Sequence, residues 1–411
     1  MKIVQGGVTA SRGFMASGVH AGLKRFKKDM AAIVSSVPCT AAGTYTTNKV
    51  KAAPVLWDSA ITAGEGTVSA VIVNSGNANA CTGERGLEDC RLIAKKACDG
   101  LFFKGFHVKP ENILICSTGV IGVPMPMGKI GPGVDALIEN LSSALEAGSD
   151  AAESICTTDT YRKEIAVSLQ IGDKEVHIGG MAKGAGMIHP NMATTLSFIT
   201  TDALIEKKTL QTMLGESVED TFNMISVDGD TSTNDTCLVL ANGEAGNDMI
   251  VSGTAEAESF REALEFVLGH LAKELVRDGE GATRFMEVKV EGAKDKKNAK
   301  ILARSVVSSS LFKAALFGAD ANWGRVLCAM GYSGADFDPA LVDLNFSSSQ
   351  GVVSVLESGI PVPFSEEKAK VVLSEKDVKI LAVCHQGEGT ATAWGCDLTY
   401  DYVKINGDYR S

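Results

Sequence analysis

Apolar and polar residues follow two different periods along the chain. Short β-branched runs at residues 67–73 (TVSAVIV) and 112–116 predict strands, and residues 165–178 predict a hairpin that turns at Gly172-Asp173. Helical spacing of apolar residues recurs between these runs and after them. The segments with helical spacing are residues 88–101, 133–145, 203–224, 256–276 and 301–317. Further strands are predicted at residues 286–290, 352–356 and 378–383. Strands and helices interleave in both halves, so the pattern predicts a mixed α/β fold.

Length and charge narrow the class of protein. At 411 residues the chain is too long for one ordinary core, which favours two or three domains or lobes. The formal net charge of −11 makes a nucleic-acid partner unfavourable. The only local basic cluster, residues 294–300 (KDKKNAK), is interpreted as a solvated loop between elements. No apolar stretch approaches the roughly 18 residues of a membrane span, so we expect no membrane partner.

The pattern of cysteines indicates the cellular compartment, and the pattern of histidines argues against a metal site. The ten cysteines form no C-x-x-C pair, and several lie in apolar runs, which favours reduced thiols and a cytoplasmic protein. The six histidines are far apart and form no H-E-x-x-H motif, so no metal site is predicted.

Residues 180–203 (GMAKGAGMIHPNMATTLSFITTDA) carry the candidate chemistry. A threonine becomes a strong nucleophile through an adjacent base, through a metal, or through its own free α-amine. The third route requires self-cleavage between Ala193 and Thr194, in which the Thr194 hydroxyl attacks the preceding carbonyl. A free α-amine has a pKa of about 7.7–8.0, which suits a general base. From the spacing alone, a turn that leads into a strand explains the same residues.

The same stretch strongly resembles the cleavage region of the ornithine acetyltransferase family, also called the glutamate N-acetyltransferase or ArgJ family. Further blocks that resemble the family follow in family order over essentially the full length. They are residues 7–24, NSGNANACTG (74–83), STGVIG (117–122), DGDTSTNDT (228–236), GADANWGR (318–325) and DYVKING (401–407), together with TTNKVKAAPV (46–55). One departure is Thr195, where the family commonly has methionine; it puts a second hydroxyl beside the first.

The resemblance implies roles for individual residues. It assigns Thr118 and Gly119 to the oxyanion hole, where backbone amides at a glycine turn can point at developing negative charge. It places Lys183 in the acyl site, where a cation can hold a substrate carboxylate or lower the pKa of the amine.

It also implies substrate contacts elsewhere in the chain. Either Thr157 or Thr158 contacts the substrate, and Glu280 meets its amino group. Asn406 and Ser411 match the terminal contacts, although the family more often ends in threonine. No role is predicted for Asn322 and Trp323 in GADANWGR, or for the NSGNANACTG block.

The function that the resemblance implies is acetyl transfer in arginine biosynthesis. Thr194 would take the acetyl group of N2-acetyl-L-ornithine and pass it to L-glutamate, with no metal or organic cofactor. The expected fold is the two-lobed α/β fold of this N-terminal-nucleophile family, cut into an α chain (1–193) and a β chain (194–411), in a dimer of α–β heterodimers. Two alternatives stay open: a bifunctional enzyme that also uses acetyl-CoA, and an N-terminal-nucleophile amidase or aminopeptidase with water as acceptor.

Overall fold

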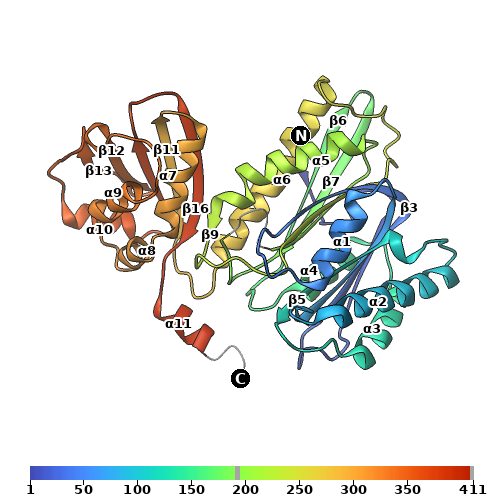
Figure 1. Ribbon diagram of the computed structural model, residues 1–411. Helices are drawn as coiled ribbons and strands as arrows, with labels where there is room; N and C mark the ends of the chain where they lie inside the picture. Colours follow the sequence, from blue (N-terminus) through green and yellow to red (C-terminus); the bar gives the residue numbers. More distant parts are fainter. Residues whose placement is uncertain (190–194, 408–411) are drawn as a thin grey trace. The chain divides into compact units, whose positions relative to one another are not determined.

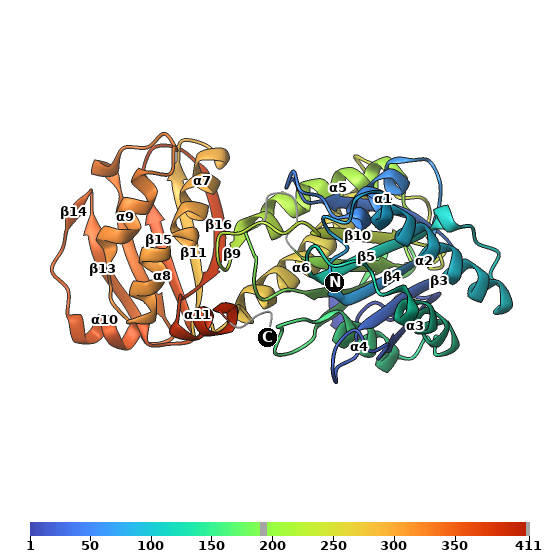
Figure 2. The same ribbon diagram turned by 60° about the horizontal axis from the view of Figure 1, so that its bottom comes forward.

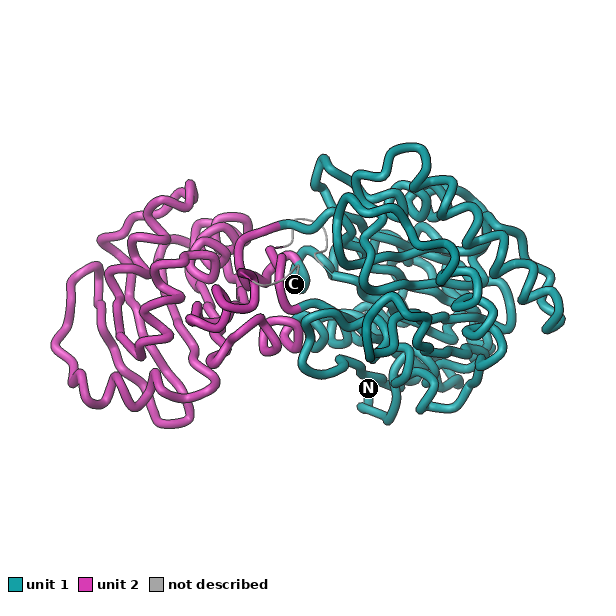
Figure 3. Tube along the Cα trace, turned by 90° about the horizontal axis from the view of Figure 1, so that it is seen from below, with its two compact units in different colours: residues 1–184, 191–222, 231–272 teal, residues 185–190, 223–230, 273–411 magenta. Residues whose placement is uncertain are grey.

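The computed structural model describes residues 1–189 and 195–407 (Figure 1). These residues divide into two compact units, which Figure 3 colours separately. Unit 1 takes residues 1–184, 195–222 and 231–272, and unit 2 takes residues 185–189, 223–230 and 273–407. Each unit is built on its own β-sheet with helices against it, which confirms the predicted mixed α/β fold.

Unit 1 contains a nine-stranded sheet in the order β1-β6-β7-β8-β10-β3-β4-β5, with β2 paired to β3. Its strands are β1 (Lys2–Val4), β2 (Phe14–Val19), β3 (Met30–Tyr45), β4 (Val68–Asn77), β5 (Ile113–Val120), β6 (Lys163–Ile171), β7 (Lys174–Lys183), β8 (Leu196–Thr201) and β10 (Thr236–Ala241). Its helices are α1 (Ala53–Ala63), α2 (Gly83–Phe103), η1 (Pro110–Asn112), α3 (Met127–Glu139), α4 (Leu145–Ile155) and α5 (Lys207–Asp220). The helix α6 (Ala255–Arg277) begins in unit 1.

Helices pack on both faces of this sheet, and side chains that alternate along its strands enter two different clusters. On β3, Met30 and Ala32 belong to the cluster that packs under α2 and α3, and Ala31 and Ile33 belong to the cluster that packs under α4. β4 and β5 are parallel neighbours at one edge of the sheet. Their carboxyl ends therefore lie side by side, where the STGVIG and NSGNANACTG blocks begin.

Unit 2 contains a seven-stranded sheet in the order β14-β13-β12-β15-β11-β16-β9. Its strands are β9 (Ile225–Ser226), β11 (Phe285–Ala293), β12 (Asp343–Ser348), β13 (Gly351–Glu357), β14 (Ile360–Pro361), β15 (Asp377–Val383) and β16 (Gly389–Cys396). Its helices are α7 (Lys296–Ser308), α8 (Ser310–Phe317), α9 (Trp323–Gly331), η3 (Pro339–Leu341), α10 (Glu366–Leu373) and α11 (Tyr400–Gly407), and η2 (Phe222–Met224) leads into β9. Figure 2 shows α7, α8 and α9 on one face of this sheet.

Most elements predicted from spacing are confirmed, and three predictions are wrong. Residues 133–145 are not one helix: α3 ends at Glu139 and α4 begins at Leu145. Between them, Ser142 pairs with Ala16 of β2 through two backbone hydrogen bonds of 2.9 and 3.1 Å, which interrupts the helix.

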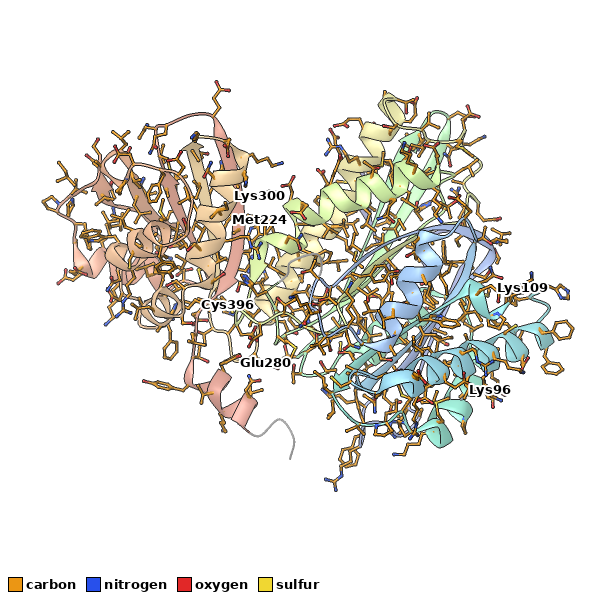
Figure 4. The ribbon with its side chains drawn as sticks, viewed as in Figure 1. Lys96, Lys109, Met224, Glu280, Lys300 and Cys396 are labelled. Carbon is orange, nitrogen blue, oxygen red and sulfur yellow. The ribbon has the colours of Figure 1, made fainter. Side chains whose placement is uncertain are left out.

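The second error concerns residues 301–317, which are not one helix: α7 ends at Ser308 and α8 begins at Ser310, and Ser309 between them is extended and caps α8 by accepting from the Phe312 amide. The third error concerns residues 294–300, which were expected to form a loop. Asp295 caps the first turn of α7 by accepting from the Asn298 amide, so Lys296 to Lys300 are helical (Figure 4 labels Lys300). The lysines at 294, 296 and 297 are nevertheless exposed.

Two chain-wide properties complete the fold. All ten cysteines carry free thiols. No helix in the described ranges combines the length and the apolarity needed to cross a bilayer.

Candidate active site

The carboxyl ends of β4 and β5 approach each other so closely that Gly119 has no room for a side chain, and both Gly76 and Gly119 have positive φ angles. Gly76 and Gly119 are register partners, with φ angles of +118° and +134°. A Cβ on Gly119 would lie 2.3 Å from the carbonyl carbon of Gly76. These angles lie in the region that glycine alone adopts freely. The positions of the backbone amide groups that follow Thr118 are therefore fixed by the packing of β5 against β4.

Buried asparagine side chains hold this strand end from both sides. Asn74 accepts from the Ser117 hydroxyl at 2.6 Å. Asn234, just before β10, donates to the Ala78 and Ser117 carbonyls at 2.6 and 2.7 Å. Each of these side chains satisfies a buried backbone or hydroxyl group near the ends of β4 and β5. The NSGNANACTG and DGDTSTNDT blocks thus position the end of β5.

Lys183, the last residue of β7, lies against this strand end within unit 1. Its ammonium Nζ donates to Thr118 Oγ1 at 3.0 Å and to Thr157 Oγ1 at 3.2 Å. Of the two candidate threonines, it is therefore Thr157 whose hydroxyl contacts the lysine. Lys183 is only 9% exposed, and burial lowers its pKa against an opposing effect of Asp159.

Asp159 is the counter-ion in this region, and the sequence reasoning did not single it out. One carboxylate oxygen accepts from Lys163 Nζ at 2.7 Å and from the Gly184 amide at 2.8 Å, and the other accepts from the Thr157 amide at 2.9 Å. Burial alone would raise the pKa of Asp159, but the ammonium groups of Lys163 and Lys183 outweigh it and lower that pKa to about 2. We call Thr118, Thr157, Asp159 and Lys183 the lysine cluster.

The chemistry of lysine fixes the direction of the hydrogen bonds in this cluster. A protonated Lys183 has donors only, so the oxygens of Thr118 and Thr157 accept. Each threonine keeps its own hydroxyl proton and can donate it to a further acceptor. Because the threonine oxygen accepts a hydrogen bond from a cation, its hydroxyl becomes a stronger donor. The cluster can therefore present two O–H donors, and Gly119 lies directly after one of them.

The predicted nucleophile and cleavage site, Ala193 and Thr194, lie outside the described residues. The neighbouring hydroxyl is described: Thr195 is buried, and its Oγ1 is 2.9 Å from the Ser197 hydroxyl. Its carbonyl accepts from the Thr236 amide at 2.8 Å, immediately before β8 and β10 pair in parallel. Thr195 is thus tied into the sheet of unit 1.

Unit 2 holds two of the other predicted substrate contacts. Glu280, labelled in Figure 4, is buried and accepts from the Asn406 amide of α11 at 2.7 Å. Its carboxylate also packs on Gly186, where an added Cβ would lie 2.4 Å from Oε2. Ser411 lies outside the described residues. The substrate roles of Glu280 and Asn406 stay predictions.

The chain just before the predicted cleavage site is anchored within unit 2. The Ile188 amide donates to Asp228 at 2.9 Å. The His189 ring lies 3.2 Å from Arg304 Nη2 through Nε2 and 3.1 Å from the Ser226 hydroxyl through Nδ1. Burial and Arg304 lower the pKa of His189 to about 4, so this ring is neutral at physiological pH.

Several of these residues were missed by sequence reasoning. Asp159 directly follows Thr157 and Thr158, which were singled out as candidate substrate contacts, and this position was the available signal. Asn234 stands inside the DGDTSTNDT block, which was singled out without a role for this residue, and nothing in the local pattern points to Arg304, whose partner His189 is far away in sequence. In GADANWGR, Asn322 caps α9 by accepting from the Arg325 amide at 3.2 Å, which gives that block a structural role.

Known proteins resemble this chain over its full length. The ArgJ family profile matches residues 15–411. The arginine biosynthesis bifunctional proteins ArgJ of Symbiobacterium thermophilum and Caldanaerobacter subterraneus subsp. tengcongensis are 54% and 50% identical to this chain over 417 and 411 residues, and each match covers 100% of both chains.

Solved structures of related proteins match about half of the chain. The arginine biosynthesis bifunctional protein from Bacillus halodurans is 46% identical with a TM-score of 0.49, covering 51% of this chain and 97% of that one. The ornithine acetyltransferase of Mycobacterium tuberculosis, solved with ornithine, is 41% identical with a TM-score of 0.44, covering 47% and 99%. The family match over residues 15–411 and the full-length relatives together decide the assignment: the chain belongs to the ArgJ family.

Proposed function

We propose that the protein is an acetyltransferase of arginine biosynthesis that moves the acetyl group of N2-acetyl-L-ornithine to L-glutamate through an acetyl ester on Thr194. The observation that carries the proposal is the lysine cluster, in which Lys183 donates to both Thr118 and Thr157 beside the Gly119 turn. Membership of the ArgJ family and full-length relatives named for arginine biosynthesis support it.

The first half-reaction breaks the acetamide bond. The α-amine of Thr194 takes the proton of its own hydroxyl, and Oγ1 attacks the acetyl carbonyl carbon. Negative charge develops on the carbonyl oxygen, where the Thr118 hydroxyl and the Gly119 amide would donate. The C–N bond then breaks, and ornithine leaves with the proton on its amine.

The second half-reaction reverses the first with a different amine. Glutamate attacks the ester carbonyl through its α-amine, and the same donors hold the oxyanion. The C–O bond breaks, and Thr194 regains its hydroxyl proton as N-acetyl-L-glutamate leaves. Ornithine and glutamate share an α-amino-carboxylate group, so one site can serve both steps, with Thr157 and Lys183 as candidate donors to the carboxylate.

Self-cleavage between Ala193 and Thr194 is part of the proposal, because it creates the free α-amine. The chain would become an α chain (1–193) and a β chain (194–411). The sheet of unit 1 draws β7 from the first segment and β8 from the second, and they pair from Ile178 to Lys183. These ladder bonds support continued association of the two chains after the cut.

The direct test is a transfer assay on purified protein. Labelled N2-acetyl-L-ornithine and L-glutamate should give labelled N-acetyl-L-glutamate, with parallel lines in double-reciprocal plots, since the first product leaves before the second substrate enters. Without an acceptor, mass spectrometry should find the acetyl group on Thr194. Release of acetate in place of transfer would favour the amidase or aminopeptidase alternative.

Acetyl-CoA as a second acetyl donor is the other candidate function. The full-length relatives carry the word bifunctional in their names, which favours a second activity. We expect N2-acetyl-L-ornithine to be the main donor, with acetyl-CoA slow, because a much larger donor needs an open approach to Thr194. Supplying each donor separately with glutamate decides this. Comparable rates with acetyl-CoA would contradict the expectation and make the enzyme bifunctional.

The remaining expectations concern cofactor, assembly and compartment. We propose that the reaction needs no metal or organic cofactor, so dialysis against a chelator should leave the rate unchanged. We also propose a dimer of α–β heterodimers in the cytoplasm. Light scattering together with denaturing electrophoresis would test the assembly by giving the particle mass and its two fragments.

A further inference from the structure

A buried ion pair joins the loop that follows α4 to the first residue of β6, next to the lysine cluster. Asp159 and Lys163 form an ion pair of 2.7 Å in which both side chains are inaccessible to solvent. A pair this deeply buried is costly to desolvate and contributes little net stability. The contacts of Asp159 suggest a different reason for its presence, because they lead to the backbone of Thr157 and to the residue that follows Lys183.

The carboxylate of Asp159 connects three points of the site. Its two oxygens fix the Thr157 and Gly184 amides at 2.9 and 2.8 Å. Gly184 directly follows Lys183. The same carboxylate therefore holds the backbone next to Lys183 and the backbone of Thr157. Thr157 in turn receives the Lys183 hydrogen bond.

We propose that Asp159 is a positioning residue for acetyl transfer: its carboxylate holds Lys183 as a cation and fixes the Thr157 loop, and so keeps the hydroxyl protons of Thr118 and Thr157 directed at the substrate. The inference rests on the proposed function, whose chemistry uses those two hydroxyls. A neutral Lys183 could accept a hydrogen bond from either threonine. Such acceptance would withdraw a donor from the oxyanion or from the carboxylate.

The charge state of Lys183 depends on every titratable group around it. Burial favours the neutral amine, and the neighbouring ammonium groups of Lys163 and Lys24 act in the same direction. Cys156 and Asp235 would favour the cation only when ionised, and burial raises the pKa of both. Asp159 is the strongest of the effects that favour the cation, and its own pKa of about 2 keeps it ionised.

The test compares Asp159→Asn with wild type across neutral and alkaline pH. The amide keeps the shape of the side chain but removes its charge, so Lys183 should lose its proton at lower pH. We expect kcat for acetyl transfer to fall by up to about 100-fold near neutral pH, the loss typical of a misplaced catalytic group. The ratio of variant to wild-type kcat should rise as the pH is lowered. A ratio that is constant with pH would overturn the inference, because a purely structural role predicts it.

Asp202→Asn is the matched control. Asp202 is equally buried and accepts from the amide and the ring of His177, at 2.6 and 3.0 Å, at the opposite end of β7 from Lys183. Its ratio to wild type should stay constant with pH. If Asp202→Asn showed the same pH-dependent ratio, the effect would not be specific to Lys183, and the inference would fail.

A second variant addresses folding. Asp159→Asn leaves Lys163 without its carboxylate, so the double variant Asp159→Asn with Lys163→Met removes both buried charges together. Thermal unfolding and intact mass establish that each variant is folded and cleaved. The double variant should keep the rising ratio at lower pH, since the loss of the carboxylate outweighs the loss of the ammonium group. A constant ratio in this variant would contradict the proposal.

A measurement that needs no activity separates this inference from the proposed function. Protein labelled with 13C at the lysine ε-carbon gives a titration curve for Lys183, whose signal is assigned by its loss in Lys183→Met. Its midpoint should lie at lower pH in Asp159→Asn than in wild type. If wild type transfers no acetyl group, the proposed function fails, and the midpoints still decide whether Asp159 holds the cation. An unchanged midpoint overturns the inference even in an active enzyme.

Discussion

Replacing Gly119 by alanine tests whether the end of β5 forms the oxyanion site. The new Cβ would lie 2.3 Å from the Gly76 carbonyl carbon and 2.5 Å from the Asn77 amide nitrogen. Ordinary van der Waals contact begins at 3.4 Å, so one strand must move by about 1 Å (3.4 − 2.3 = 1.1). Both obstructing atoms belong to the backbone, so a side-chain rotation cannot relieve the clash.

The size of the effect follows from that displacement. A shift of about 1 Å at a catalytic group costs about 100-fold in rate. Complete loss of one oxyanion donor costs about 10²–10³ in kcat, or about 2.7–4 kcal/mol. We therefore expect kcat of Gly119→Ala to fall by about 10²–10³ with KM much less changed, because the donor acts mainly in the transition state. The free energy of unfolding should fall by about 1–3 kcal/mol from overpacking.

The assay measures initial rates per cleaved molecule, with the cleaved fraction taken from intact mass, and stability from urea unfolding. Gly122→Ala is the matched control in the same STGVIG block: its φ is also positive, at +79°, but no atom lies within 4 Å of the added Cβ. It should lose about 1–2 kcal/mol of stability from the strained φ alone and keep kcat within a few-fold of wild type. Equal kcat in both variants, or a change in KM only, would refute the assignment of Gly119.

Two further outcomes are expected. Thr194→Ala should stay folded, uncut and inactive, as seen by intact mass and the transfer assay; a cut and active variant would move the nucleophile to Thr195, even though that hydroxyl is buried beside Ser197. His189 has a folded pKa of about 4 against an ordinary 6.5, so the unfolded chain binds the proton first and stability is lost as the pH falls from 6.5 toward 4. Urea unfolding across that range should show a smaller loss in His189→Gln, and an equal loss would contradict the effect of burial and Arg304.

Much of the fold could be predicted because its signals are local. The runs at 67–73 and 112–116 overlap β4 and β5 and begin one residue before each of them, and the stripe at 256–276 matches α6. Residues 133–145 failed because the break there comes from Ala16, whose pairing with Ser142 spans most of the preceding chain. Local periodicity cannot report a distant strand that competes for backbone hydrogen bonds.

The residues of the candidate site also fall into two groups: those that the local sequence marks and those that only folding brings to the site. Thr118 and Lys183 stood out because glycine turns and a family resemblance mark them, and the structure places them in contact. Asp159 and Asn234 were missed, because an aspartate or an asparagine in a polar loop carries no sign of burial. Their importance comes from the partners that folding brings to them, across 117 and 156 residues in the case of Asn234.

The position of β10 in the sheet of unit 1 has a consequence for the timing of maturation. β10 is made after β8 and lies between β8 and β3, so it alone joins the two groups of strands. Asn234, at its start, also completes the support of the β5 end. A nascent chain that has not yet been synthesised through residue 241 therefore lacks both a continuous sheet and full support for the β5 end, the proposed oxyanion turn. If the proposed cut uses that turn, the bond between Ala193 and Thr194 becomes reactive only after the ribosome has synthesised β10. The unfinished chain is then protected from cleavage while it is still attached to the ribosome.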